Sequence, residues 1–321
     1  MTSEPARRYS SRHSGNDVED LGTDFDSSTS AAPEFGQVAV DGLVRLLDLE
    51  KIEKDIYRGR SPKSALPRVF GGQVAGQALV ATGRTVPPDR QVHSLHSYFI
   101  RAGDPQVPIV YEVERIRDGH SFSTRRVTAV QNGKAIFTLS ASFQLEQSGI
   151  EHQSTMPDAP PPESLPTLEQ RYRDAPGAAA VFRSMPRPID LRYVDDPSWQ
   201  QRRNGPRDGL NRVWMRANGR LPDHPLVHVC VLTFASDLTL LDTVLARHGL
   251  ALGLDAVTMA SLDHAMWFHR SFRADEWFLY ASKSPAAAGS RGLATGRFYA
   301  RDGTQLASVV QEGMIRVGNA D

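Results

Sequence analysis

Hydrophobic and polar positions alternate along two long stretches of the chain, and the alternation predicts antiparallel strands in both. The first stretch predicts a short helix or turn at 43–48, a strand at 52–58, a helix at 71–83, and strands at 92–101, 107–118, 121–131 and 134–144. Asn132-Gly133 is a strong signal for a two-residue hairpin turn. The helical run 71–83 contains Gly72 and Gly76, and each glycine costs a helix up to about 1 kcal/mol relative to alanine. We therefore expect this helix to pack closely against a sheet, where small residues permit close approach.

The second stretch predicts a similar order of elements. They are a strand at 212–217, a buried apolar segment at 227–235 that runs into a helix after Asp237, and strands at 266–273, 277–284, 290–301 and 305–317. Between the two stretches, prolines interrupt every pattern except a short polar helix near 165–174. The chain is therefore expected to be α+β, with a disordered N-terminal tail at 1–38, an N-terminal module at 39–146, a proline-rich connection at 147–207 and a C-terminal module at 208–318.

Composition narrows the classes of protein. The 321 residues include 37 basic and 37 acidic side chains, and this balance argues against a general nucleic-acid binder, which needs a basic surface. No apolar run has the length of a membrane span, and the N-terminus lacks the apolar segment of a secretory signal. Cys230 is the single cysteine, which rules out an intrachain disulfide and fits a buried thiol. We expect a cytoplasmic protein.

The second module repeats short segments of the first. Phe70-Gly71-Gly72-Gln73 corresponds to Phe234-Ala235-Ser236-Asp237, Tyr98-Phe99-Ile100-Arg101 to Trp267-Phe268-His269-Arg270, and Asn132-Gly133-Lys134 to Asp302-Gly303-Thr304. In this register Gln73 corresponds to Asp237, Val92 to Ser261 and Ala141 to Gln311. One copy therefore carries a carboxylate, a hydroxyl and a carboxamide where the other carries an amide and two aliphatic side chains. This asymmetry predicts a single active site.

Longer motifs resemble a known family. The segments are 70–78, 92–104 and 117–122 in the first module, and 236–238, 263–270 and 310–313 in the second. Together they resemble the acyl-CoA thioesterase II (TesB-like) family over residues 40–146 and 208–317. A long helix wrapped by an antiparallel sheet, twice in one chain, is the double hot-dog architecture. The resemblance therefore implies two tandem hot-dog modules.

The same resemblance implies hydrolysis of fatty acyl-CoA thioesters to free fatty acid and CoA. Family members hold a water molecule with an Asp, a Thr or Ser hydroxyl and a Gln, which map to Asp237, Ser261 and Gln311. The family commonly has Thr where this chain has Ser261. Direct attack by the water needs no metal or organic cofactor. Backbone N–H groups at the helix start, Gly71 and Gly72, are candidates for oxyanion or substrate contacts. A homo-oligomer is expected, with acyl-CoA as the partner and no membrane span.

Other interpretations remain open from the residues. Asp237 after Ser236 also fits the cap or first turn of a helix. A hydratase acting on enoyl-CoA, or a non-catalytic acyl-CoA-binding protein, would share the fold. A metal site at His264 and His269 is not favoured, because five residues of strand place them on opposite faces. The Gly-His-Ser-Phe-Ser segment at 119–123 lacks the last glycine of a nucleophile elbow. A further set fits either CoA phosphate contacts or a solvated strand face: Arg117, Arg125 and Arg126.

Overall fold

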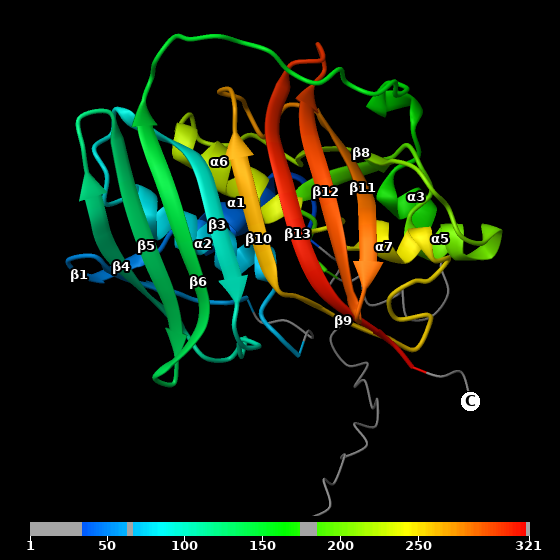
Figure 1. Cartoon of the computed structure of the whole chain (residues 1–321), viewed down its shortest axis with the longest axis horizontal. Coiled ribbons are helices and arrows are strands. Elements are labelled where there is room, and N and C mark those ends of the chain that lie inside the picture. The colour runs from blue at the N-terminus through cyan, green and yellow to red at the C-terminus, as the bar shows by residue number, and fades with distance from the viewer. Residues whose placement is uncertain (1–33, 63–66, 174–184, 319–321) are drawn as a thin grey trace, which may run out of the picture. The chain divides into compact units, whose positions relative to one another are not determined.

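The computed structural model describes residues 34–62, 67–173 and 185–318 (Figure 1). The predicted tail at 1–38 lies almost wholly outside these residues. Its last three residues belong to a helix, α1 (Gly36–Leu47), so the predicted boundary is wrong there. The helix predicted at 43–48 is the second half of α1. Alanine, valine and leucine recur at helical spacing in α1 and form its buried stripe: Ala39, Val40, Leu43 and Leu47.

Thirteen strands of the described residues form one sheet, and every pair in it is antiparallel. The strands of the first half are β1 (Glu50–Glu53), β2 (Ile56–Gly59), β3 (Arg90–Phe99), β4 (Ile109–Asp118), β5 (Phe122–Gln131) and β6 (Lys134–Leu145). The strands of the second half are β7 (Ile189–Tyr193), β8 (Asn211–Ala217), β9 (Val257–Ser261), β10 (Asp263–Phe268), β11 (Phe278–Ala288), β12 (Arg291–Ala300) and β13 (Gln305–Val317). Their order is β1-β2-β4-β5-β6-β3-β10-β13-β12-β11-β8-β7, and β9 pairs with β13. Each half of the chain therefore builds one half of the sheet, and the halves join at β3 and β10.

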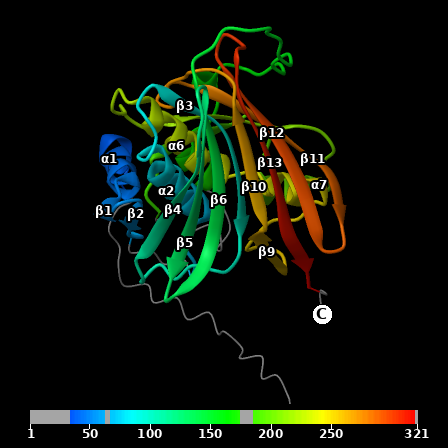
Figure 2. The same cartoon turned by 60° about the vertical axis from the view of Figure 1, so that its left-hand side comes forward.

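The remaining helices include two long central ones that pack against each other. These helices are α2 (Gly71–Gly83), α3 (Leu168–Tyr172), α5 (Ser198–Gln201), α6 (Pro225–Ser236) and α7 (Asp242–Arg247), with 3₁₀ turns at Pro162–Ser164 and Arg202–Asn204. Figures 1 and 2 show α1, α2 and α6 on one face of the sheet. Between α2, α6 and this face lie fully buried side chains: Ala78, Leu79, Leu95, Cys230, Val231 and Met266. Burial raises the pKa of the Cys230 thiol, as the sequence led us to expect of a buried cysteine.

The two central helices run antiparallel with their backbones in close contact. A Cβ atom at Gly72 would lie 2.5 Å from the carbonyl oxygen of Phe234, and one at Gly76 would lie 3.3 Å from that of Cys230. These glycines are therefore needed for the close approach. The predicted helix at 71–83 is confirmed residue for residue. It packs against the sheet, as predicted, and also closely against the other central helix.

The buried apolar segment predicted at 227–235 does not run into a helix that starts after Asp237. It is itself the helix α6, and Asp237 lies at its C-terminal end. The apolar residues of α6 face the sheet on one side and α2 on the other, so the segment shows no amphipathic period. Pro225 at the first helical turn is the sequence signal for this start, because proline is tolerated there.

The internal repeat holds in the sheet and fails in the helices. His96 of β3 pairs with Ala265 of β10, and these counterparts, 169 residues apart, face each other across the junction of the two halves. Val92 pairs with Phe143 and Ser261 pairs with Gly313, which keeps Val92 and Ser261 equivalent. The helices α2 and α6, however, start only 154 residues apart.

The expected equivalence of Gln73 and Asp237 is therefore wrong. Gln73 lies in the first turn of α2, whereas Asp237 follows the last turn of α6. The extra residues of the second half lie between α6 and β9. Two smaller differences concern the ends of the modules: residues 50–59 form the hairpin β1–β2 about Asp55, and β7, inside the predicted connection, adds an edge strand beside β8.

Candidate active site

Asp237 lies where the end of one central helix meets the start of the other. It caps the C-terminal end of α6, and the backbone N–H of Gly72 at the start of α2 is near enough to lower the pKa of its carboxyl. A Cβ atom at Gly71 would lie 2.7 Å from Asp237 Oδ2 and 3.0 Å from the ring of Phe99. The carboxylate therefore occupies space that only a glycine leaves open.

Gln311 joins the other two predicted residues. Its Nε2 atom donates to Asp237 Oδ1 and to Ser261 Oγ, both at 2.8 Å. Gln311 is fully buried on β13, and Ser261 is the last residue of β9, whose pairing partner is Gly313. The structure thus brings together Asp237, Ser261 and Gln311 from three separate elements.

The environment of Asp237 changes its acidity. Burial raises the pKa of its carboxyl from 3.8 to about 6, and the hydrogen bonds from Gln311 and from the Gly72 backbone oppose that rise. The negative end of the α6 dipole acts in the same direction as burial. A carboxylate with this pKa is mostly ionised at neutral pH and still basic enough to take a proton from water.

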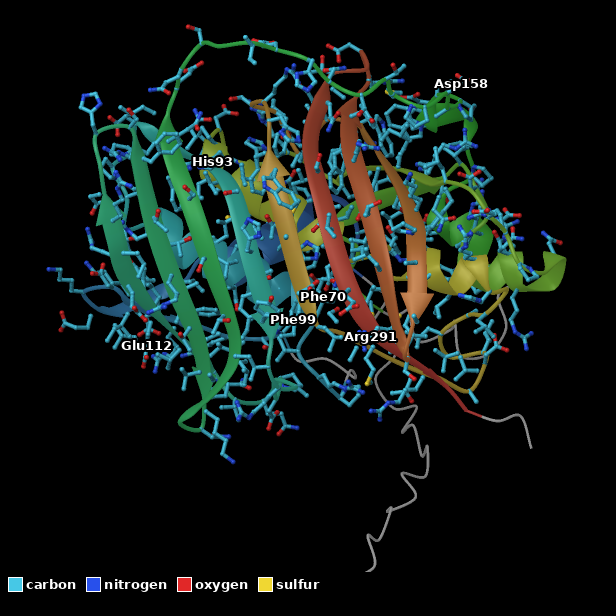
Figure 3. The ribbon with its side chains drawn as sticks, in the orientation of Figure 1. Phe70, His93, Phe99, Glu112, Asp158 and Arg291 are labelled. Carbon is cyan, nitrogen blue, oxygen red and sulfur yellow. The ribbon has the colours of Figure 1, made fainter. Side chains whose placement is uncertain are left out.

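Aromatic rings surround the start of α2. Phe70 contacts Phe234 edge to face with ring centroids 5.1 Å apart, and Phe99 packs on Phe137 at 5.0 Å. Figure 3 shows Phe70 and Phe99 beside the ends of the two strands that join the halves of the sheet, β3 and β10. The start of α2 therefore lies among aromatic rings from both halves of the chain.

The two histidines that were considered as metal ligands have other roles. His264 of β10 is buried, its Nε2 atom lies 2.9 Å from Ser236 Oγ, and burial lowers its pKa to about 4. His269 is exposed, and its Nε2 atom lies 2.9 Å from Ser308 Oγ. Among the described residues no group of three His, Cys, Asp or Glu side chains could hold a metal ion.

Comparison with known proteins identifies the family. Residues 185–314 match the family model for acyl-CoA thioesterase, and residues 60–144 match the model for the acyl-CoA thioesterase N-terminal domain. Acyl-coenzyme A thioesterase 8 of Mus musculus is 44% identical over 290 residues, which cover 85% of this chain and 88% of that protein. The chain belongs to the acyl-CoA thioesterase family. Acyl-CoA thioesterase 2 of Haemophilus influenzae is 36% identical over 285 residues, covering 86% of this chain and 98% of that protein.

Solved structures agree with this family assignment. The acyl-CoA thioesterase II TesB2 of Mycobacterium marinum is 45% identical to this thioesterase, with a TM-score of 0.71 over 87% of this chain and 100% of that one. A protein with a hot-dog fold from Alicyclobacillus acidocaldarius is 18% identical, with the same TM-score over 87% and 99% of the two chains, and shows the shared fold alone. The predicted double hot-dog fold is confirmed.

In this thioesterase the first module has no equivalent set of polar groups. Ala141 stands where the second module has Gln311, and its cross-strand partner is Arg125, a fully buried cation. The Arg125 guanidinium donates to Asp118 Oδ1 at 2.7 Å and to the Thr85 carbonyl oxygen at 3.1 Å, just beyond the end of α2. The place equivalent to the candidate site is therefore filled by an arginine, which agrees with the predicted single site.

Two further side chains of the first module are also engaged in structural contacts. Gln73 is buried and donates to Ser61 Oγ at 2.9 Å, so it holds the segment after β2. Arg126 pairs with Glu114 across β4 and β5 on the exposed face. Because Arg125 is buried and bonded inside the module, the possibility that it contacts CoA phosphates is wrong.

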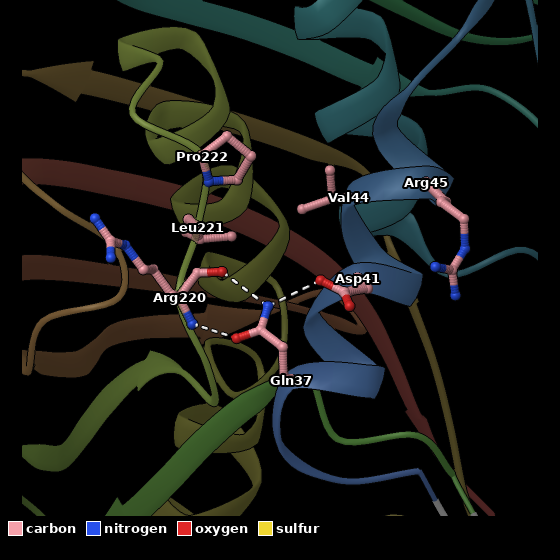
Figure 4. Close-up of a pocket in the computed structure, with 7 residues that line it drawn as sticks. All are labelled: Gln37, Asp41, Val44, Arg45, Arg220, Leu221 and Pro222. Carbon is pink, nitrogen blue, oxygen red and sulfur yellow. Dashed lines mark hydrogen bonds between the residues drawn. The ribbon is translucent and has the colours of Figure 1, made fainter.

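A pocket of the thioesterase lies outside this set of residues. Figure 4 shows it between α1 and the turn before α6, where Gln37 Nε2 donates to Asp41 Oδ1 at 2.8 Å and to the Arg220 carbonyl oxygen at 3.0 Å. Its lining consists of Gln37, Asp41, Val44, Arg45, Arg220, Leu221 and Pro222, and includes none of the three predicted catalytic residues. Separately, none of the helices in the described residues combines the length and the apolar character that a membrane crossing requires.

Proposed function

We propose that Asp237 activates a water molecule for direct attack on the thioester carbonyl of acyl-CoA, with Ser261 and Gln311 fixing the position of the water. One observation carries this proposal: Gln311 Nε2 lies 2.8 Å from both Asp237 Oδ1 and Ser261 Oγ. A single amide thus sets the distance between the base and the hydroxyl. Because Gln311 is fully buried, this arrangement is rigid.

In this mechanism the water oxygen bonds to the carbonyl carbon while a water proton passes to the Asp237 carboxylate. Asp237 Oδ1 already accepts a hydrogen bond from Gln311, so we assign the proton to Oδ2. Oδ2 lies close to Gly71, which has no side chain there. The tetrahedral intermediate then expels the CoA thiolate, and the proton held by Asp237 goes to that sulfur. The products are the free acid and CoA, and the carboxylate is ready for another turnover.

The predicted oxyanion donors divide into two roles. The backbone N–H of Gly72 favours the charged form of Asp237, so we assign it to the base. We propose that the N–H of Gly71, the first residue of α2, points at the developing oxyanion, where the positive end of the helix dipole adds to the stabilisation.

The alternatives predict different products. An enoyl-CoA hydratase needs an acid beside the base, and one candidate, His264, is buried and engaged with Ser236. A non-catalytic binding protein would retain acyl-CoA intact. We would supply acyl-CoA and enoyl-CoA substrates from short to long chain and measure thiol release and double-bond hydration in the same samples. Thiol release by the wild type and its loss in Asp237→Asn support the thioesterase mechanism, and hydration without thiol release contradicts it.

Four further proposals concern the acyl group, the catalytic unit, the oligomeric state and the cellular compartment. We propose that the acyl groups are fatty acids, because an apolar channel gains about 0.8 kcal/mol for each buried methylene. We propose that the modules at 39–146 and 208–318 act as one catalytic unit, that the chain forms a homo-oligomer and that it works in the cytoplasm. Sedimentation of the purified protein measures the oligomeric state, and fractionation of cells measures the compartment.

A further inference from the structure

Two polar atoms near the site lack a standard hydrogen-bond partner within the described residues. They are Gln311 Oε1 and His264 Nδ1, and both are buried. His264 and Gln311 are the next residues beyond the paired Ala265 and Val310 of β10 and β13, so they are direct cross-strand neighbours on the inner face of the sheet. Such neighbours have Cβ atoms about 4.5–5.5 Å apart, within reach of each other's side chains.

The charge of Asp237 determines which way the Gln311 amide points. An ionised carboxylate only accepts hydrogen bonds, so the NH₂ group of Gln311 has to face it, as observed. The carbonyl oxygen of the amide then faces away from Asp237 and toward the imidazole of His264. Gln311 raises the pKa of His264 against the larger effect of burial, as an acceptor beside a ring N–H does.

The orientation of the Gln311 amide also determines the tautomer of His264. The low pKa keeps the ring neutral, so it carries one proton. Opposite the Gln311 carbonyl oxygen that proton has to be on Nδ1, since two acceptors would repel each other. The other nitrogen, Nε2, is then an acceptor for the hydroxyl of Ser236 at 2.9 Å. Ser236 also lies 2.8 Å from the Thr233 carbonyl oxygen, so its one proton has a second acceptor within reach.

We propose that His264 is a positioning residue of the thioesterase reaction: its Nδ1–H holds Gln311 Oε1, and Ser236 holds the ring in the tautomer that makes this possible. The proposal rests on the proposed function, because it assigns to Gln311 the placement of the attacking water. It links Ser236, His264 and Gln311 to Asp237 in one chain of donated hydrogen bonds. His264 itself touches neither the water nor the substrate.

Loss of this contact has a consequence that packing alone would not have. Without a donor at position 264, the Gln311 carbonyl oxygen has no partner, and the amide is held at one end only. Its NH₂ group then donates to the carboxylate less well, and a weaker hydrogen bond to the charged form raises the pKa of Asp237. The other groups around Asp237 keep their places, namely the Gly72 N–H and Tyr280, whose hydroxyl donates to the Ser236 carbonyl oxygen.

The test compares His264→Asn with His264→Leu. The asparagine NH₂ group can take the place of Nδ1–H, whereas leucine fills the space without a donor. We expect the Leu variant to lose about 10- to 100-fold in kcat with KM nearly unchanged, the range for a residue that orients a catalytic group. The fall of kcat at low pH, its acid limb, should occur at a higher pH than in the wild type. The Asn variant should recover most of the kcat, and its kcat should fall at the same low pH as that of the wild type.

The control is His228→Leu, because His228 is a second buried histidine, near the start of α6. Its activity per folded molecule and its acid limb should equal those of the wild type. Equal kcat and equal acid limbs in the Asn and Leu variants would overturn the positioning role. Absence of thiol release by the wild type would instead overturn the proposed function, so the two failures are distinct.

A measurement on the wild type covers the case in which the Leu variant does not fold. Nitrogen-15 chemical shifts of the His264 ring distinguish a protonated Nδ1 from a protonated Nε2. We expect the Nδ1–H tautomer at neutral pH. The Nε2–H tautomer in the wild type would contradict the proposal.

Discussion

A Cβ atom at Gly71 would lie 2.7 Å from Asp237 Oδ2, so the start of one central helix packs directly against the side chain that ends the other. Each residue comes from a different half of the chain. The antiparallel packing of α2 and α6 produces this contact, because it brings the positive end of one helix dipole to the negative end of the other. The base of the proposed mechanism therefore depends on both modules.

The raised pKa of Asp237 predicts the pH dependence of turnover. Asp237 has to be ionised to accept a proton from water, so kcat should fall as the pH drops through about 6. The change Asp237→Asn should lower thiol release by a factor of at least about 100 and remove this acid limb from the residual rate. Steady-state kinetics between pH 4 and 8 measure both effects. Normal turnover in a folded Asp237→Asn protein would refute the role of the base.

The same pKa predicts that Asp237→Asn stabilises the fold at neutral pH. The folded state raises the pKa from 3.8 to about 6, so it binds the proton more tightly than the unfolded state does. The cost of the ionised form is absent below pH 3.8, grows as the pH rises to about 6, and is complete above that. At about 1.36 kcal/mol for each pKa unit, the cost is on the order of 3 kcal/mol. Urea unfolding of both proteins at pH 4 and 7 should show an advantage of the Asn variant only at pH 7.

The sheet of this protein could be predicted from the sequence far better than its second helix. Alternation and the turn at Asn132-Gly133 place β5 and β6 within a residue or two. Pairing registers keep the same offset in both halves, so Ser261 and Gln311 were found by comparing the copies. The element that carries Asp237 was misread because α6 is apolar on all sides, and burial against both the sheet and α2 erases the helical period.

The contacts around the three predicted residues left no signal in the sequence. Ser236 and His264 are 28 residues apart in a helix and a strand, and only the packing of α6 on β10 brings them together. Arg125 alternates like a strand residue and looked like part of a solvated face. The structure instead buries it against Asp118, an ion pair formed across a hairpin end that depends on the fold.

Gly71 gives a test of the close approach at the site. A methyl group there would lie 2.7 Å from Asp237 Oδ2, so Gly71→Ala should displace the carboxylate and lower kcat by at least about 10-fold, since a misplacement of 1 Å can cost about 100-fold. Gly149→Ala is the matched control, because a Cβ atom there meets nothing within 4 Å. Equal kcat in the two variants would show that the carboxylate has room to move.

Ser261 tests whether the hydroxyl or the shape of the side chain matters. Gln311 donates to Ser261 Oγ, which leaves the hydroxyl proton free to point at the attacking water. Ser261→Ala should lose about 10- to 100-fold in kcat, in line with a residue that orients a reacting group. Ser261→Thr keeps the hydroxyl and should retain most of the wild-type kcat. If alanine is tolerated as well as threonine, the hydroxyl has no part in holding the water.

The last prediction concerns the number of sites in each chain. Ala141 and Val92 offer neither a carboxamide nor a hydroxyl, and the buried Arg125 fills the place beside them. The guanidinium is bonded to Asp118 and to the buried Thr85 hydroxyl, and its departure would leave that hydroxyl unpaired, so the first module cannot form an equivalent site at low cost. Titration with a tight, non-hydrolysable acyl-CoA analogue should therefore abolish thiol release at one equivalent for each chain. Asp237→Asn serves as the control, because it should bind the analogue with the same stoichiometry while lacking turnover. Two equivalent inhibitory sites for each chain would mean that the arginine-filled module still accepts substrate.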